Sequence, residues 1–211
     1  MAVRDHTHAV IGACACVPLA ILLGGSVMLP ICAAAGAIGA VLPDIDHPHS
    51  AWGRFVPWPA AAVENHHTGF VAHGRRWFGG RTIWHRGETH SIGAAGIAVL
   101  ATLALGRWLS GATFAWLQRR GAPPVAHLPL VAWGLAAVAA AAVLVGYLSH
   151  LVADLANPSP QMLWWPFSRR MVHPHWAPAI PEASIQGQWL ERGAVVAAIA
   201  LAMLLWGGRP V

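Results

Sequence analysis

Long apolar runs alternate with polar segments along this chain of 211 residues. The first run is long enough to cross a hydrocarbon core of ~30 Å at a helical rise of ~1.5 Å per residue. The second run is short and rich in Ala and Gly, and small residues let helices pack closely in lipid. It therefore predicts the return arm of a tight helical hairpin. The last run is marginal in length. The runs cover residues 9–29, 31–42, 92–109, 130–155 and 194–206.

Two polar segments, at about 43–89 and 157–190, separate these runs. The first contains many His, Trp, Gly and Arg residues and the second many Pro residues. Both are expected on the membrane surface, where Trp suits the headgroup region. The pattern predicts an all-α fold, a polytopic membrane bundle of four to five apolar helices with a polar site at one membrane face. Residues 1–211 are expected to form a single domain.

Composition also indicates a lipid-covered surface, since 56% of the residues are hydrophobic and 10% are charged, against about 25% charged in soluble domains. The first run leads into the second without a convincing cleavage site, so we expect a retained membrane helix. The net charge of +5 comes from arginines scattered over loops. Without a basic helix or an aromatic RNA-binding signature, nucleic acid is not an expected partner. The three cysteines are expected to be buried without disulfides.

The arginines predict the orientation in the membrane. If the runs cross in turn, the N-terminus and both polar segments share one side, which carries nine arginines. The opposite side carries four, namely Arg107, Arg119, Arg120 and Arg209. The positive-inside bias then places the motif-bearing side in the cytoplasm.

An acidic motif, Pro43-Asp44-Ile45-Asp46-His47-Pro48, follows the second run. Proline disfavours helix at the preceding residue, so an extended turn is expected, in which residues two apart face the same way. Asp44 and Asp46 would then present two carboxylates to one site, and His47 would ligate a metal or orient a carboxylate. The alternative is a solvated acidic turn that ends the helix. Because acidic residues near a membrane core are costly, a function is favoured.

Near the end of the fourth run, His150 and Asp154 have i,i+4 spacing and share one helix face. Two ligands one turn apart can bind one ion without rearranging a loop, and mixed imidazole and carboxylate ligands suit zinc, manganese or iron. The alternative is a His–Asp hydrogen bond that satisfies two buried polar groups. His8 starts the first run on the same side, although a lone His at a helix end is more often structural.

A further motif, His85-Arg86-Gly87-Glu88-Thr89-His90-Ser91, leads into the third run. Thr89 or Ser91 is a plausible N-cap, which places His90 at the helix start and His85 in the preceding loop. Arg86 could pair with an anionic substrate group or a lipid phosphate. The alternative is an interfacial loop rich in polar residues.

These blocks together carry a resemblance. Leu42-Pro43-Asp44-Ile45-Asp46-His47-Pro48-His49-Ser50, the motif from His85 to Ser91, Gly146-Tyr147-Leu148-Ser149-His150-Leu151-Val152-Ala153-Asp154 and Leu163-Trp164-Trp165-Pro166 resemble the YdjM-like family of bacterial inner-membrane predicted metal-dependent hydrolases. The match runs from His8 to about Glu191, with an insert at about 60–82 that shorter members lack. That family resembles zinc-dependent phospholipases C and P1-type nucleases. The resemblance implies the metal ligands His8, Asp44, Asp46, His85, His90, His150 and Asp154, with His47 close by.

The resulting prediction is a multi-pass inner-membrane hydrolase in which a divalent metal activates water. Zinc is the expected metal, and manganese or iron are the alternatives. Asp44 or Asp46 would ligate or accept a proton, and Arg86 would stabilise negative charge. Expected partners are membrane lipid and a small-molecule or lipid phosphoester. A non-catalytic scaffold with a structural metal is the alternative. A metal-ion transporter is disfavoured, because the centres of the runs lack Asp, Glu and His. The substrate and the oligomeric state stay open.

Overall fold

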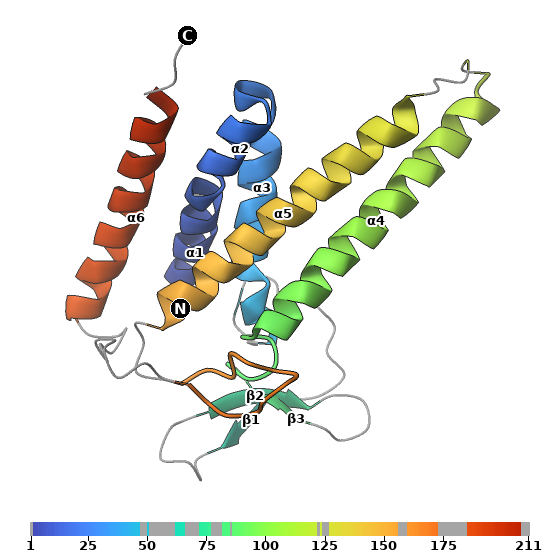
Figure 1. Ribbon diagram of the computed structural model, residues 1–211. Helices are drawn as coiled ribbons and strands as arrows, with labels where there is room; N and C mark the ends of the chain where they lie inside the picture. Colours follow the sequence, from blue (N-terminus) through green and yellow to red (C-terminus); the bar gives the residue numbers. More distant parts are fainter. Residues whose placement is uncertain are drawn as a thin grey trace.

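A computed structural model describes residues 2–46, 50, 62–65, 72–76, 82–84, 86–121, 123, 127–155, 160–172 and 185–207. Its longer helices run roughly alongside one another, and a small three-stranded sheet lies at one end of them (Figure 1). The N-terminus lies at that end and the C-terminus lies at the other.

The first two apolar runs form the expected hairpin. Helix α1 (Ala2–Ala15) and α2 (Val17–Leu23) form one interrupted arm, the short 3-10 helix η1 (Gly25–Val27) makes the turn, and α3 (Leu29–Val41) returns. The interruption at Cys16 precedes Pro18, which lacks an N–H donor and clashes with the preceding turn.

The remaining helices are longer than the hydropathy pattern predicted. Helix α4 spans Ile92–Arg119, α5 spans Leu128–Asp154 and α6 spans Ile185–Gly207. The expectation that the third helix ends near residue 109 was wrong, because Ser110 and Gly111 continue the helix. The Ser110 hydroxyl donates to the Gly106 carbonyl within the helix. The segments His6–Leu23, Ile92–Arg119 and Leu128–Asp154 are long and apolar enough to cross a membrane, and Leu29–Val41 and Arg192–Gly207 are shorter apolar helices.

Small residues bring α1, α3 and α5 into close contact. A Cβ atom added at Gly146 of α5 would overlap the backbone carbonyl of Gly36 in α3, and one at Gly36 would overlap the sulfur of Cys16. Cys16, Cys32 and Val143 are buried in this core, and all three cysteines of the chain are free thiols. The close approach matters for function because it sets the distance between the lower ends of α3 and α5.

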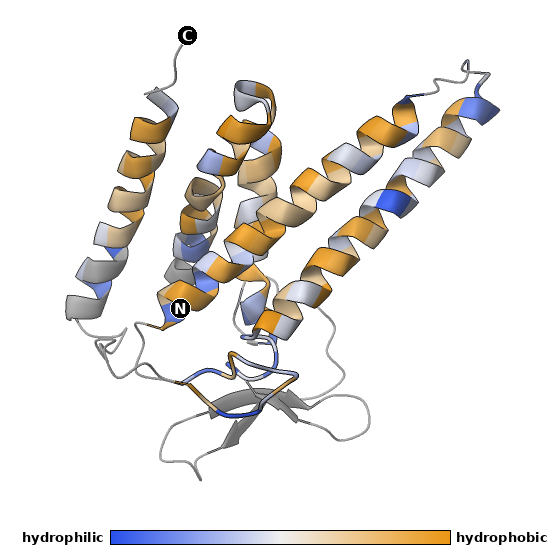
Figure 2. Cartoon of the chain, viewed as in Figure 1, coloured by the Kyte–Doolittle hydropathy of each residue, from blue (hydrophilic) through white to orange (hydrophobic). Residues whose placement is uncertain are grey.

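Hydrophobic residues predominate along the helices (Figure 2). Leu22, Leu100, Leu130 and Leu204 are exposed, as expected where lipid replaces water as the solvent. Helix α4 pairs with α5, and α6 packs beside α1 and α2. The described part of the chain is thus a helical membrane protein with three candidate spans.

The surface segment after α3 holds structure that the sequence analysis did not predict. The 3-10 helix η2 (Pro43–Asp46) follows α3. Strands β1 (Ala62–Asn65), β2 (Ala72–Arg76) and β3 (Thr82–Trp84) then form an antiparallel sheet in the order β1-β2-β3. In Figure 1 this sheet lies below the lower ends of the helices. Its strands are only three to five residues long, so their alternating pattern is too short to stand out among Gly, Trp and Arg.

Candidate metal centre

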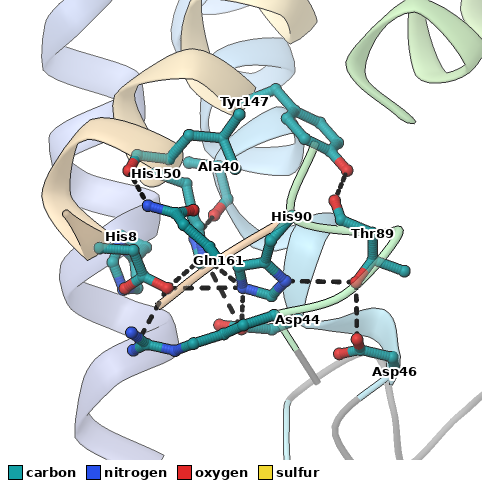
Figure 3. A network of polar contacts seen from close by, with 12 residues as sticks. His8, Ala40, Asp44, Asp46, Thr89, His90, Tyr147, His150 and Gln161 are labelled. Carbon is teal, nitrogen blue, oxygen red and sulfur yellow. Dashed lines mark hydrogen bonds and ion pairs between the residues drawn. The ribbon is translucent and has the colours of Figure 1, made fainter. Parts of the chain in front are cut away.

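Four elements that are distant in sequence bring nitrogen and oxygen donors together at the lower ends of the helices (Figure 3). His8 comes from α1, Asp44 from η2, His90 from the turn before α4, and His150 and Asp154 from α5. His90, His150 and Asp154 are almost completely buried. Two groups of these residues, His8 with Asp44 and His150, and His90 with His150 and Asp154, lie close enough to hold a metal ion.

The ligand atoms face one another at short range. The Nε2 atoms of His90 and His150 are 3.3 Å apart. Asp44 Oδ1 lies 3.4 Å from His90 Nε2 and 3.7 Å from His150 Nε2. Asp154 Oδ2 lies 3.5 Å and 3.6 Å from the same two nitrogens. One oxygen of each aspartate therefore lies within 3.7 Å of both histidine nitrogens.

The main chain fixes the orientation of the His150 ring. Its Nδ1 lies 2.7 Å from the carbonyl oxygen of Ala40. Because a carbonyl can only accept, Nδ1 carries the proton and donates it, which leaves the lone pair of a neutral ring on Nε2. A second hydrogen bond of this kind is the usual support of a metal-ligating histidine. The contact exists because the glycine packing holds α3 against α5.

A side-chain relay fixes His90 in the same way. The Thr89 hydroxyl donates to Asp46 Oδ2 at 2.6 Å, so its oxygen accepts from His90 Nδ1 at 3.2 Å. The Thr89 carbonyl in turn accepts from the buried hydroxyl of Tyr147. His90 Nε2 therefore also points its lone pair at the cluster. Asp46 acts on His90 through Thr89, whereas Asp44 faces the histidines directly (Figure 3).

The spacing of the donor atoms fits a metal ion. A tetrahedral site with bonds of about 2.0–2.1 Å to nitrogen and oxygen has ligand atoms about 3.3–3.4 Å apart. The five distances among Asp44, His90, His150 and Asp154 lie between 3.3 and 3.7 Å. Facing lone pairs and carboxylates repel one another unless a cation or a proton lies between them. The donor set therefore suits a divalent ion such as Zn²⁺.

Without a metal, the carboxylates favour a proton on His90. Burial opposes the charged imidazolium, but hydrogen bonds with Asp154 and Asp44 outweigh it and raise the pKa of His90 to about 9. The same carboxylates that would ligate a cation thus stabilise the positive ring. A metal that binds here must displace this proton, which couples metal binding to pH.

His8 and Arg86 surround the cluster. The His8 ring stacks on His150 with centroids 4.0 Å apart, and its Nε2 lies 3.8 Å from Asp154 Oδ1. His8 Nδ1 is buried without a hydrogen-bond partner among the described residues. The buried Arg86 guanidinium pairs with Asp154 Oδ2 at 3.3 Å. Arg86 has a φ of 64°, a left-handed conformation that is unfavourable for this residue type.

A loop at residues 160–172 holds Arg86 and the start of α4 in place. The Met162 N–H donates to the Arg86 carbonyl at 2.9 Å, and the Ile92 N–H donates to the Leu163 carbonyl at 3.0 Å. Gln161, which is buried, donates from its amide to the Leu151 carbonyl at 3.0 Å. The loop thus holds the backbone of Arg86 through Met162, and Gln161 attaches the loop to α5.

Comparison with known proteins places this arrangement in a family. The sequence model of the family described as "YdjM inner membrane protein" matches residues 2–210. The chain belongs to the YdjM inner membrane protein family. Two relatives are each described as "Inner membrane protein YdjM", one from Escherichia coli (strain K12) and one from Shigella flexneri. Each is 30% identical to the chain over 166 residues, which is 79% of this chain and 59% of the relative.

The chain therefore spans about 59% of the length of these YdjM relatives. No solved structure matches it. Family membership and the three apolar helices confirm the predicted multi-pass location in the inner membrane. The family name carries no reaction, so the chemistry must be argued from the site itself.

For this YdjM family member, the structure brings most of the predicted site residues together. Asp44 and Asp154 both lie beside the histidine pair His90 and His150, and His8 and Arg86 adjoin Asp154. Ser91 is the N-cap of α4, and its hydroxyl accepts from the Ala94 N–H at 3.1 Å. His47 and His85 lie outside the described residues.

The expected extended turn at the acidic motif was wrong. Residues 43–46 form a 3-10 helix, in which the Ile45 N–H donates to the Leu42 carbonyl at 3.1 Å. Pro43 permits this because its fixed φ suits the first turn of a helix. With a period of about three residues, Asp44 and Asp46 point in different directions. This is why only Asp44 faces the histidine pair.

Sequence reasoning missed the groups that orient the ligands. Thr89 was considered only as a possible N-cap, although its hydroxyl joins Asp46 to His90. Tyr147 stands in the same apolar run as His150 and is the single tyrosine of the chain. A buried hydroxyl needs a hydrogen-bond partner, so a tyrosine at this position of an apolar run could have indicated a polar contact with another element. The contact with the Ala40 carbonyl could not be predicted from the sequence, because every residue type has a backbone carbonyl.

Proposed function

We propose that this protein is a membrane-bound, metal-dependent hydrolase of phosphoester bonds and that its site takes a divalent cation, with zinc the best fit and manganese or iron as alternatives. One observation carries the proposal. The Nε2 atoms of His90 and His150 face each other at 3.3 Å, with carboxylate oxygens of Asp44 and Asp154 at 3.4–3.7 Å from them.

In this proposal, Asp44, His90, His150 and Asp154 hold the ion. A bound divalent cation lowers the pKa of a water molecule and polarises a phosphoryl oxygen. Asp46 and Thr89 keep the Nε2 lone pair of His90 directed at the ion, as the Ala40 carbonyl does for His150. The Arg86 guanidinium brings positive charge beside the donors through its pair with Asp154, where it can orient an anionic phosphate.

The position of the site favours a lipid-linked substrate. Its ligands stand at the ends of candidate spans. His150 and Asp154 lie at the end of Leu128–Asp154, and His8 lies at the start of His6–Leu23. A phosphoester in a lipid headgroup would reach this depth without leaving the bilayer. We propose that the site faces the cytoplasm, as the arginine asymmetry predicts.

A structural metal in a non-catalytic scaffold is a second candidate, and one observation favours it. Four protein donors can close the shell of a zinc ion, and structural sites are closed whereas catalytic sites keep one position open. In the enzyme, one coordination position would stay open to water or substrate.

The first test is metal content and activity. Detergent-purified protein loaded with zinc should hold the ion and hydrolyse members of a panel of phosphomonoesters, phosphodiesters and phospholipids. His150→Ala and Asp154→Ala should each lose both the metal and the activity. His6→Ala is the matched control, because His6 is exposed and lies two residues from His8. Apolar spans keep their backbone hydrogen bonds in lipid, so these variants should still fold.

The outcomes separate the candidates. Zinc bound in the wild type with no hydrolysis of any ester, together with a lower melting temperature for His150→Ala, would establish the structural metal and reject the enzyme. Full zinc occupancy in Asp154→Ala would remove Asp154 from the ligand set. No zinc in the wild type under conditions that keep it folded would reject both candidates.

A further inference from the structure

An arginine lies far from the metal centre, on the apolar hairpin of α4 and α5. Arg107 is exposed in the middle of α4, about 22 Å along the axis from the start of that helix at ~1.5 Å per residue. The segment Ile92–Arg119 is long and apolar enough to span a membrane. A charge at this depth is costly unless it finds a partner or reaches an interface.

No acidic residue stands near this arginine along the hairpin. The eight acidic residues of the chain are Asp5, Asp44, Asp46, Glu64, Glu88, Asp154, Glu182 and Glu191. None stands between residues 89 and 153, so the hairpin lacks an acid except for Asp154 at the end of α5. Glu88 and Asp154, which flank this stretch, both lie on the side of the metal centre. An anion that pairs with Arg107 must therefore come from outside the hairpin.

The surroundings of Arg107 form a cavity rather than a flat helix surface. A cavity of about 610 Å³ lies between the outer halves of α4 and α5, and its lining includes Ala104, Arg107, Phe114, Leu128 and Trp133. The guanidinium carbon of Arg107 is 5.5 Å from the centre of the Trp133 ring. A guanidinium held over a ring in this way keeps its N–H groups available for oxygen ligands.

Exposed tryptophans indicate the depth of this cavity. Trp108, Trp116 and Trp133 are 67%, 54% and 42% exposed, and all three lie on the outer halves of α4 and α5 that are joined at the top of Figure 1. Tryptophan prefers the boundary between headgroups and acyl chains. The cavity therefore extends from Arg107, inside the span, towards the headgroup level of the leaflet opposite the metal centre, where lipid phosphates are available.

We propose that Arg107 and Trp133 form a binding site for an anionic phospholipid of that opposite leaflet. The lipid phosphate accepts hydrogen bonds from the Arg107 guanidinium, and the apolar wall of Ala104, Phe114 and Leu128 contacts the first carbons of its acyl chains. The charge of the lipid complements the outer half of the hairpin, which carries arginines and no acid. This site is separate from the proposed hydrolase site and does not depend on it.

The test measures lipid retention by native mass spectrometry. Wild-type protein in micelles doped with equal amounts of phosphatidylglycerol and phosphatidylcholine should retain about tenfold more phosphatidylglycerol, because the choline cation of phosphatidylcholine offsets the phosphate charge that Arg107 pairs with. Arg107→Gln should bring the two lipids to equal retention. Arg107→Lys should keep part of the preference, because it keeps the charge but loses the planar fork.

Arg119→Gln is the matched control. It removes the same charge from the same helix, but Arg119 does not line the cavity and its Nε donates to the Ala115 carbonyl. This variant should retain phosphatidylglycerol like the wild type. Equal losses in Arg107→Gln and Arg119→Gln would show non-specific surface charge and overturn the site. So would a wild type without preference, or an Arg107→Gln variant that changes only the oligomeric state. Thermal melting should confirm that each variant is folded.

Discussion

Two aspartates of one short motif have different surroundings at the scale of single residues. Asp44 Oδ1 faces both metal-centre histidines, whereas Asp46 accepts from Thr89 and so reaches His90 only indirectly. The sequence treats them alike, because both are acids of one motif between Pro43 and Pro48. Their roles can be separated by the same conservative substitution at each position.

Asp46→Asn should weaken zinc binding by about 10–100-fold, the usual effect of removing the partner of a ligating histidine. Asp44→Asn should weaken it more, since it removes a proposed ligand. Both dissociation constants can be measured by competition with a zinc chelator. Asp46→Asn also leaves a neutral amide next to Thr89, so the ring of His90 is less firmly held. Equal losses at the two positions would contradict the relay through Thr89.

The titration of His90 predicts a pH dependence. Its pKa is raised from 6.5 to about 9 in the folded protein, so its contribution to stability is complete below pH 6.5 and is lost as the pH rises through about 9. Zinc must displace this proton. Calorimetry in buffers of different ionisation enthalpy should therefore show the release of about one proton from His90 at pH 7, and less above pH 9. No change in released heat between buffers would contradict this assignment.

Helix contacts decide the geometry at the scale of elements. His150 donates to Ala40 across α5 and α3, although 110 residues separate them in sequence. Gly146 and Gly36 allow this approach, because a side chain at either position would overlap neighbouring atoms. The metal centre therefore depends on small residues that do not touch it.

Gly146→Ala should push α5 away from α3 and lower the stability by about 1–3 kcal/mol, the typical effect of overpacking. It should also weaken zinc binding, because His150 loses the carbonyl that orients its ring. Gly134→Ala is the control on the same helix, since a Cβ there meets open space. Thermal melting and zinc affinity measure the two effects. The same melting temperature for both variants would show that the packing at Gly146 is loose.

Orientation in the membrane belongs to the scale of the whole molecule. Nine arginines on the side of the metal centre against four on the other side predict that the centre faces the cytoplasm. Because α4 continues to Arg119 and α5 begins at Leu128, a reporter should be inserted between residues 120 and 127. Alkaline phosphatase there should be active, since that loop would lie in the periplasm. An inactive phosphatase together with an active cytoplasmic reporter at the same position would reverse the orientation.

Local properties of the sequence were sufficient to predict the apolar helices and the end of the helices at which the His and Asp side chains lie. Hydropathy depends on residues next to one another, and the i,i+4 spacing of His150 and Asp154 on a helix needs no knowledge of the rest of the fold. Ser91 as an N-cap is local in the same sense. The helix ends were less predictable, because Ser110 and Gly111 are tolerated inside α4 when the helical turns before and after them are both formed.

Tertiary structure decided which of the polar residues meet. The 3-10 turn at residues 43–46 separates Asp44 from Asp46, and the packing of Gly36 against Gly146 sets the distance from Ala40 to His150. Thr89 and Tyr147 gain their roles only from partners on other elements. These contacts join segments that are distant in the chain, and the backbone carbonyl of Ala40 is independent of side-chain identity. Sequence therefore determined the donor types, and helix packing determined their arrangement.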